Sequence, residues 1–147
     1  MFVFYDIEYL CLLHKLQQLQ VIAEDNYEIY IPLLQLENYS GDIKLDIQQC
    51  HNKGFLKFIY DDDNGFLPFL NKHELNNSFF GTGFLYQLYC CMNRDLILII
   101  DNHNIAQVQL CNKLKIKTIT VEDFTKTVIK NEQYYNFLMA NKDKVII

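Results

Sequence analysis

Two short apolar runs, each followed by an aspartate, constrain the fold of this chain more than any other feature. Residues 2–5 precede Asp6, and residues 96–100 precede Asp101. Apolar runs of this length are typical of strands in a parallel sheet that helices cover on both faces. Ligands of such sheets bind outside the carboxyl ends of the strands. If the two strands are neighbours, their aspartates meet at one edge and form a site for a hard cation such as Mg²⁺ or Mn²⁺.

The length and composition fit one globular domain over residues 1–147. Of the 147 residues, 50% are hydrophobic and 21% are charged, which is sufficient for an independent core. The formal net charge is −5, so the chain has no overall basic field that would attract nucleic acid. This charge disfavours a tight nucleic-acid binder, but it leaves open an enzyme that reaches its substrate through metal ions.

The cysteines indicate a reduced, cytoplasmic protein. They include no Cys-x-x-Cys pair, they are odd in number, and most lie in apolar segments, so we expect buried free thiols. We expect neither a signal peptide nor a membrane-spanning segment, because acidic residues interrupt the first apolar stretch and no apolar run is long enough. The five cysteines are Cys11, Cys50, Cys90, Cys91 and Cys111.

Helical and strand patterns alternate along the rest of the chain. After Asp6, one helix is predicted from apolar residues at helical spacing, namely Leu10, Leu13, Leu16 and Leu19. Further strands are predicted over residues 28–31, 55–60, 96–100 and 117–121, and further helices over residues 32–37, 42–50, 68–80, 84–92 and 105–113. Thr120 and Asp123 fit a capping box for a last helical region. The fold class expected is α/β, with a central, mostly parallel sheet of four to five strands.

The order of these features resembles the PIN-domain ribonucleases. In the first half, the resemblance lies in Asp6, the leucine series, and the Tyr-Ile-Pro sequence at residues 30–32 with Glu37 five residues later. In the second half, it lies in the Phe-Gly-Thr-Gly turn at residues 80–83 and in the strand that ends at Asp101. The similarity extends over nearly the whole chain, in the same order, so a single PIN-like domain is expected.

This resemblance implies a Rossmann-like three-layer sandwich that hydrolyses RNA with divalent ions. Asp6 matches the acid that ends the first strand, Glu37 the acid on the helix after the proline, and Asp101 the acid that ends the fourth strand. The three are therefore the expected catalytic residues and the expected ligands of Mg²⁺ or Mn²⁺, which would activate water. Many members of the family are toxins of toxin–antitoxin pairs and many form homodimers. RNA, an antitoxin protein and a second copy are thus the implied partners, without a membrane.

Three positions depart from the family pattern. Phe84 stands where an acid usually follows the second glycine, Ile7 where a small or polar residue usually follows the first aspartate, and Asn102 where a second acid is frequent. Phenylalanine removes a charge and adds apolar bulk, which disfavours a two-ion site. The remaining possibilities are a one-ion site, or a PIN-like domain that no longer cuts and acts as a binding or assembly module.

The sequence leaves two further alternatives open. Residues 6–8, Asp-Ile-Glu, resemble the first motif of 3′–5′ exonucleases, in which both acids alternate on one strand. Two observations disfavour this alternative: the residues that follow predict a helix, and Gln107 occupies a later position where these enzymes have an aspartate. Alternatively, Asp6 and Asp101 only cap the helices that follow their strands, and Glu37 is an ordinary exposed helical glutamate. Glu8 is expected to face solvent.

Overall fold

The structure is a computed structural model and describes residues 1–4, 7–37, 39–60, 63–92, 94–100 and 104–142. Within these residues, five strands form one parallel sheet in the order β3-β2-β1-β4-β5. The strands are β1 (Phe2–Val3), β2 (Ile29–Pro32), β3 (Lys57–Ile59), β4 (Ile97–Ile100) and β5 (Thr118–Thr120). The α/β class and the parallel sheet predicted from the sequence are confirmed.

Both faces of this sheet are buried. Successive side chains of a strand point to opposite faces, so each strand contributes to two cores. Phe2, Ile29 and Ile99 enter one core cluster, whereas Val3 and Leu98 enter the other. A strand that is buried on both faces needs apolar residues at every position, which explains the uniform apolar runs in the sequence.

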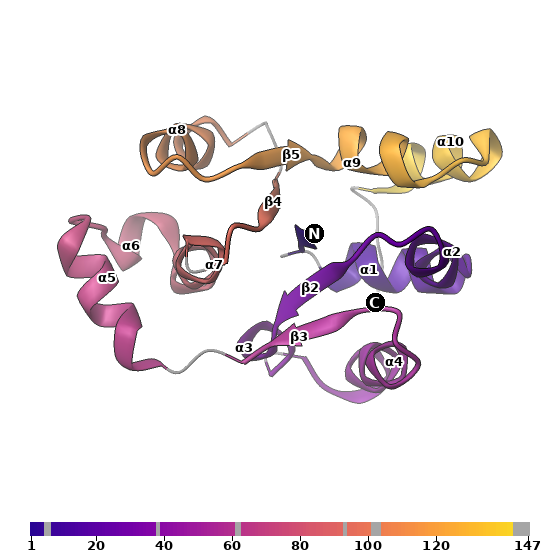
Figure 1. Ribbon diagram of the computed structural model, residues 1–147, viewed down its shortest axis with the longest axis horizontal. Helices are drawn as coiled ribbons and strands as arrows, with labels where there is room; N and C mark the ends of the chain where they lie inside the picture. The colour runs from indigo at the N-terminus through magenta and orange to yellow at the C-terminus, as the bar shows by residue number, and fades with distance from the viewer. Residues whose placement is uncertain (5–6, 38, 61–62, 93, 101–103, 143–147) are drawn as a thin grey trace.

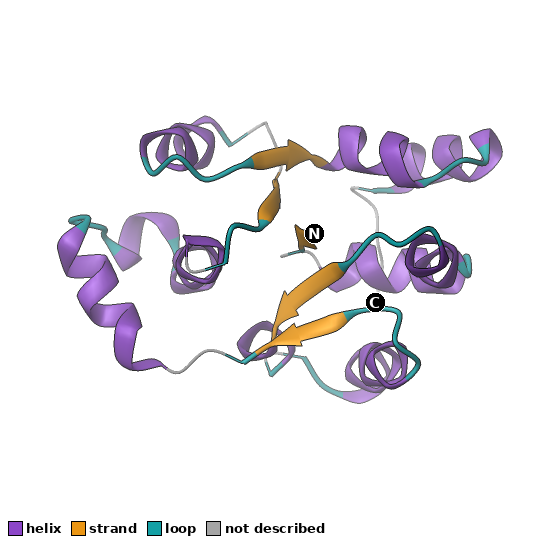
Figure 2. Cartoon of the chain, viewed as in Figure 1, coloured by secondary structure: helices purple, strands orange, loops and turns teal. Residues whose placement is uncertain are grey.

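Helices cover the two faces and give three layers (Figures 1 and 2). Figure 1 shows one helical layer to the right of the strands, consisting of α1 (Ile7–Lys15), α2 (Gln18–Glu24), α4 (Gly41–Asn52), α9 (Val121–Val128) and α10 (Glu132–Asn141). The layer to the left consists of α5 (Phe66–Lys72), α6 (Asn77–Phe80), α7 (Thr82–Met92) and α8 (Ile105–Lys113). The short helix α3 (Leu33–Leu36) follows β2 directly and lies at its arrowhead. This arrangement is consistent with a Rossmann-like three-layer fold.

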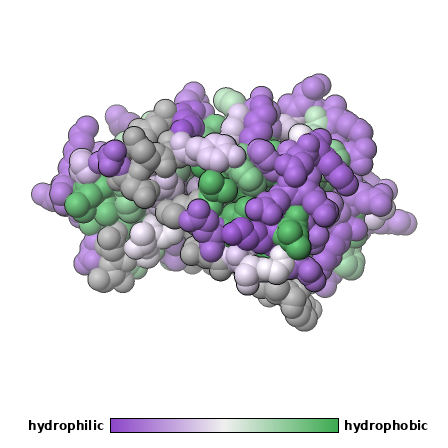
Figure 3. Space-filling view, turned by 90° about the horizontal axis from the view of Figure 1, so that it is seen from below, coloured by the Kyte–Doolittle hydropathy of each residue, from purple (hydrophilic) through white to green (hydrophobic). Residues whose placement is uncertain are grey.

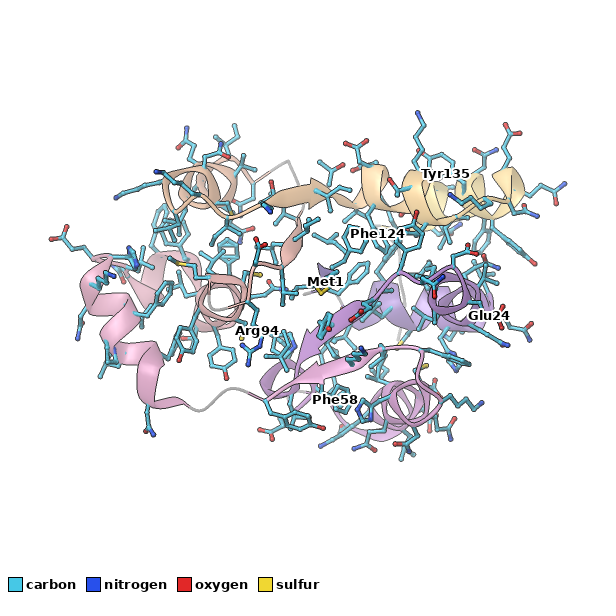
Figure 4. The ribbon with its side chains drawn as sticks, viewed as in Figure 1. Met1, Glu24, Phe58, Arg94, Phe124 and Tyr135 are labelled. Atoms are coloured by element: carbon cyan, nitrogen blue, oxygen red, sulfur yellow. The ribbon has the colours of Figure 1, made fainter. Side chains whose placement is uncertain are left out.

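Phe124 of α9 shows how the right-hand layer is held to the sheet. Its ring centroid lies 5.0 Å from that of Phe2 and 5.0 Å from that of Phe4, in edge-on contacts on the central strand and its extension. Figure 4 shows Phe124 between α9 and the strands. One residue later, the Thr125 hydroxyl forms a buried 2.6 Å hydrogen bond with the hydroxyl of Tyr9, which joins α9 to α1.

The helix predicted through Leu10 and Leu19 is in fact two helices. α1 ends at Lys15 and α2 begins at Gln18. Between them, Gln17 has a φ of 59°, a left-handed conformation that a right-handed helix cannot contain. The leucine spacing continues across this break because both helices bury their leucines in the same core, so the prediction of one helix was wrong.

The region before α7 also differs from the prediction. Residues 68–80 form two helices, α5 and α6, and α5 begins at Phe66. Pro68 lies in the first turn of α5, where its missing N–H has no helical partner to lose. α7 begins at Thr82 rather than at Phe84, directly after Gly81, whose φ of 84° is readily accessible only to glycine.

The predicted helix starts had mixed outcomes. The Thr120 hydroxyl accepts a hydrogen bond from the backbone N–H of Asp123 at 3.1 Å and caps α9, as predicted. α8 has the predicted bounds, Ile105–Lys113. By contrast, the helix predicted over residues 42–50 extends at both ends: α4 spans Gly41–Asn52, and Asp42 lies in its first turn.

All five cysteines are buried and free, as the sequence predicted. Cys11 and Cys50 belong to the core cluster that contains Phe2, and the other three belong to the cluster that contains Val3. In the part of the chain that the structure describes, every helix is too short or too polar to cross a bilayer.

Candidate functional site

The order of the strands brings the segments that carry the candidate acids to one edge of the sheet. β1 lies between β2 and β4 and is parallel to both, with Val3 opposite Tyr30 and Leu98. After β1 the chain moves to one side of this strand through β2 and β3, and it returns to the other side at β4. Such a switch point beside the central strand is where open parallel sheets bind ligands.

Two of the three candidate acids, Asp6 and Asp101, lie outside the residues that the structure describes. Their described neighbours in the chain are Ile7, the first residue of α1, and Ile100, the last residue of β4. The acids therefore belong to the segments that follow the carboxyl ends of two adjacent parallel strands, and it is the structure that shows these strands to be neighbours.

The third candidate acid, Glu37, is described and exposed. It is the C-cap residue of α3, and its backbone N–H donates to the Leu33 carbonyl oxygen at 3.3 Å. Two residues earlier, Gln35 is buried and its Nε2 donates to the Gly83 carbonyl oxygen at 3.0 Å. Residues two apart on a helix face different sides, so Gln35 faces α7 and Glu37 faces away from it. The glycine-rich turn therefore lies beside the segment that carries Glu37, although the two are far apart in the sequence, and Glu37 does not face the turn.

Glu8 lies nearer to this region than the sequence suggested. It is in the first turn of α1 and is half-buried, and its Oε2 accepts a hydrogen bond from the Tyr39 hydroxyl at 3.2 Å. The expectation of a solvent-facing glutamate was therefore wrong. An acid at this place is also favoured by the positive end of the helix dipole of α1.

Together, these two hydrogen bonds hold the segment that carries Glu37 across the edge of the sheet. Gln35 attaches one side of the segment to the start of α7, and Tyr39 attaches the other side to the start of α1. Sequence reasoning did not find Gln35 or Tyr39, because neither forms part of a motif. The only sequence signal for Glu8 was its spacing of two residues from Asp6.

Phe84 occupies the core at the position where the resemblance would place an acid. It is 5% exposed and belongs to the core cluster that also contains Val3 and Leu98, with its ring centroid 6.2 Å from that of Phe80. From this residue through Cys91, α7 is buried throughout. Phe84 thus contributes to packing and offers no ligand.

The motif shared with 3′–5′ exonucleases is not supported by the local structure. That motif needs an acid at residue 8 on a strand, whereas Glu8 lies in helix α1. Gln107, where the resemblance would need an aspartate, instead lies in α8, and its backbone N–H donates to Oδ1 of Asn104, the N-cap of that helix, at 3.2 Å.

The chemistry of the donors suits a hard cation, because carboxylate oxygens are the ligands that Mg²⁺ and Mn²⁺ prefer. Among the residues that the structure describes, no three His, Cys, Asp or Glu side chains lie close enough to hold one metal ion. Two of the three predicted ligands, Asp6 and Asp101, fall outside those residues. Glu37 is the predicted ligand that the structure describes, and Glu8 is bonded to Tyr39 in the segment that carries Glu37.

A cavity of about 230 Å³ lies at the opposite edge of the sheet, near the amino ends of β2 and β3. Its charged residues satisfy each other: the Glu28 carboxylate accepts from the Tyr30 hydroxyl at 2.6 Å and from Lys57 Nζ at 3.1 Å. These bonds, first that from Tyr30 and then that from Lys57, lower the pKa of Glu28. The cavity lies at the amino ends of β2 and β3, whereas Glu37 follows the carboxyl end of β2. It is lined by Ala23, Asn26, Tyr27, Glu28, Ile29, Gly54, Phe55, Leu56 and Lys57.

Comparison of this chain with models of known protein families, with curated proteins and with solved structures gave no significant match. The function must therefore be inferred from the residues, from the topology of the sheet and from the contacts around the α3–α4 connection.

Proposed function

We propose that this protein is a PIN-like, Mg²⁺- or Mn²⁺-dependent ribonuclease, with Asp6, Glu37 and Asp101 as the catalytic metal ligands. The observation that carries the proposal is the parallel pairing of β1 with both β2 and β4. Because of this pairing, the three segments that bear the acids leave the sheet at the same edge. A toxin role, with an antitoxin protein and a second copy as partners, belongs to the same proposal through the resemblance to PIN domains.

The residues of this chain would form the site, but by themselves they would leave its negative charge largely uncompensated. Carboxylates gathered at one edge repel one another, and the net charge of −5 also repels phosphate. A divalent cation would supply the missing positive charge and activate water for attack on the phosphodiester. The hydrogen bonds of Gln35 and Tyr39 would restrict the position of Glu37 for this purpose. Activity should therefore depend strictly on the cation.

A second candidate function, a PIN-like binding or assembly module that does not cut, is favoured by two observations. Phe84 is buried in the core where a ligand would be expected. In addition, Leu67 of α5 and Phe79 of α6 are 62% and 70% exposed. Figure 3 shows hydrophobic surface at the left end of the molecule, where α5 and α6 lie in Figure 1. Exposed apolar surface of this kind is suited to contact with another protein.

Titration with Mn²⁺ distinguishes the two candidates. For the ribonuclease, saturating Mn²⁺ at about a hundred times the dissociation constant should stabilise the wild type by about 2.7 kcal/mol. Single-stranded RNA should be cleaved in Mn²⁺ and remain intact in EDTA. Both effects should be lost in Asp6→Asn and Asp101→Asn, and weakened in Glu37→Gln.

Asp25→Asn is a matched control, because Asp25 is exposed beyond α2 at the opposite edge of the sheet. Stabilisation by Mn²⁺ and cleavage of RNA should be the same in this variant as in the wild type. A wild-type protein that gains no stability from Mn²⁺ and leaves RNA intact would reject the ribonuclease. In that case Leu67→Asp and Phe79→Asp test the second candidate, since they should abolish any self-association seen by sedimentation. A wild type that sediments as a monomer at all concentrations would reject assembly with a second copy.

A further inference from the structure

The most exposed apolar side chains lie at the edge of the sheet that carries the candidate acids. Among the residues that the structure describes, the three large apolar side chains with the greatest exposed fraction are Phe79, Ile105 and Tyr60, at 70%, 67% and 66%. Single apolar residues are common on protein surfaces and need no explanation. Three that share one edge call for an explanation, because unrelated exposed residues would be scattered over the whole surface.

Two of the three come directly after the carboxyl end of a strand. Tyr60 follows Ile59, the last residue of β3, and Ile105 is the first residue of α8, the helix after β4. All of these strands are parallel, so both residues lie at the carboxyl edge of the sheet. Figure 1 shows the chain leaving the arrowhead of β3 beside α3, the helix that leads to Glu37.

Phe79 reaches the same edge through the turn before α7. It belongs to α6, which ends at Phe80, two residues before the start of α7. The hydrogen bond from Gln35 Nε2 to the Gly83 carbonyl oxygen holds this start beside α3, which follows the carboxyl end of β2. The connection that carries Phe79 is therefore in contact with the segment that carries Glu37.

Inner aromatic rings hold both exposed rings in place. The Phe79 ring contacts that of Phe80 edge-on, with centroids 4.8 Å apart, and the Phe80 ring lies 6.2 Å from that of the core residue Phe84. The Tyr60 ring is edge-on to that of Phe58, with centroids 6.2 Å apart. A ring that is already held in one orientation loses little conformational freedom when a ligand stacks on it.

The surroundings of these rings fit unpaired bases better than a protein. The core of a protein interface is apolar, and charged residues are depleted from it. Here acids adjoin the apolar residues along the chain, since Tyr60 precedes the aspartates at 61–63 and Ile105 follows Asp101 by four residues. Aromatic rings bind unpaired bases one at a time by stacking, whereas the bases of a duplex are stacked on one another and are inaccessible to them.

We propose that Tyr60 and Phe79 form a base-stacking platform, on which single-stranded RNA lies across the edge of the sheet that carries the candidate acids. This inference rests on the proposed function and names its substrate class, which is unpaired rather than duplex RNA. Stacking adds affinity without positive charge. It therefore suits a chain with a net charge of −5, whose contacts with phosphate must otherwise be made through metal ions.

Binding in EDTA tests the platform separately from cleavage. The probes are a short single-stranded RNA, the same oligomer without its bases, and a blunt RNA duplex of equal length, each followed by fluorescence anisotropy. High salt screens the repulsion between phosphates and acids, whereas stacking is retained. The wild type should bind the single strand more than about tenfold more tightly than either of the other two probes.

Substitutions of the two rings distinguish stacking from other apolar contact. Phe79→Ala and Tyr60→Ala should each weaken binding of the single strand by about fivefold to a hundredfold. Phe79→Tyr keeps the face of the ring and should bind like the wild type, whereas Phe79→Leu stays apolar and should be as weak as Phe79→Ala. Because both side chains are exposed, all of these variants should unfold at nearly the temperature of the wild type.

Phe137→Ala is the matched control. Phe137 is 46% exposed on α10, which lies at the opposite end of the molecule from α6 in Figure 1. This variant loses a ring of the same kind, and it should leave the affinity for all three probes unchanged.

Two binding results would reject the platform. The first is equal affinity of the wild type for the oligomer with and without its bases. The second is wild-type affinity for the single strand in both Phe79→Ala and Tyr60→Ala. If these substitutions instead convert a dimer to a monomer in sedimentation, with RNA affinity unchanged, the surface contacts a second copy and the inference is wrong.

Cleavage in Mn²⁺ separates this inference from the proposed function. A wild type that binds through both rings but leaves RNA intact in Mn²⁺ would reject the ribonuclease and retain the platform. A wild type that cleaves RNA in Mn²⁺, with the same KM in Phe79→Ala and Tyr60→Ala, would retain the ribonuclease and reject the platform.

Discussion

Replacing Gly65 with alanine measures how closely the start of α5 is packed against α7. Gly65 has a φ of −88°, which any residue can adopt, so alanine adds no backbone strain. A Cβ at this position would lie 2.2 Å from Tyr89 Oη and 3.1 Å from Tyr89 Cζ. The first distance is far below a normal contact between carbon and oxygen, so the tyrosine or the backbone must move.

The tyrosine has little room to move. Tyr89 is 9% exposed, and its ring centroid lies 5.8 Å from Phe66, 5.5 Å from Phe69 and 5.9 Å from Tyr86. Overpacking of this kind costs about 1–3 kcal/mol. Alanine also restricts the unfolded chain and fits the native backbone here, which stabilises the protein by about 0.4–1 kcal/mol and offsets part of the cost of overpacking. Gly65→Ala should therefore destabilise the protein by about 1–2 kcal/mol, which lowers Tm by roughly 2–8 °C for a chain of this size.

The assay is urea denaturation followed by circular dichroism, in the wild-type and Tyr89→Phe backgrounds. Tyr89→Phe removes the oxygen that lies 2.2 Å from the added methyl group. In this background Gly65→Ala should cost clearly less than in the wild type, because only ring carbons, the nearest at 3.1 Å, still crowd the added methyl group, so the two substitutions should be coupled by about 1 kcal/mol. Equal effects of Gly65→Ala in both backgrounds, or no effect in the wild type, would refute the packing argument.

Two further predictions concern a helix cap and the buried thiols. Thr120→Ala should lower the free energy of unfolding by about 1 kcal/mol in urea denaturation because it removes the cap of α9. Thr118→Ala, at the exposed end of the same strand, should lower this free energy by less. Equal losses of stability in the two variants would contradict the role of the cap. Burial raises the pKa of the Cys91 thiol to about 12 and that of Cys111 to about 11, from an ordinary value of 9.0. Because these folded-state pKa values lie above the unfolded one, the stability that the neutral buried thiols contribute is complete below pH 9 and is lost as the pH rises from 9 toward 12. The urea midpoint should therefore fall over this range, and it should fall less in Cys91→Ala. At pH 8 the native thiols should react with a disulfide reagent far more slowly than in urea, and rapid labelling of the native protein would show that they are accessible.

Much of the secondary structure could be predicted from the sequence because it depends on local patterns. The strand before Asp101 is apolar at every position because both of its faces are buried, and the structure contains it as β4. The bounds of α8 and the cap at Thr120 were also correct, since both depend on residues within one turn. The break at Gln17 was not predictable, because the same leucine spacing continues on both sides of it.

The contacts around the candidate site could not be predicted, because they join residues far apart in the sequence. Gln35 contacts Gly83 across 48 positions, and Tyr39 contacts Glu8 across 31. No periodicity or motif contains such a pair. Phe84 shows the same limit, since the resemblance places it at a possible ligand position, and only the packing of α7 shows that it belongs to the core.

The amino-acid sequence by itself determined which segments are strands or helices and which strands lead to an acid. Repeats of two and of 3.6 residues are properties of the local chain, so they can be read without the fold. The tertiary structure alone decided that β1 lies between β2 and β4, and therefore that the three segments carrying acids leave one edge. Strands pair through backbone hydrogen bonds that nearly every residue can make, so the order of strands is decided by how the helices pack and connect them.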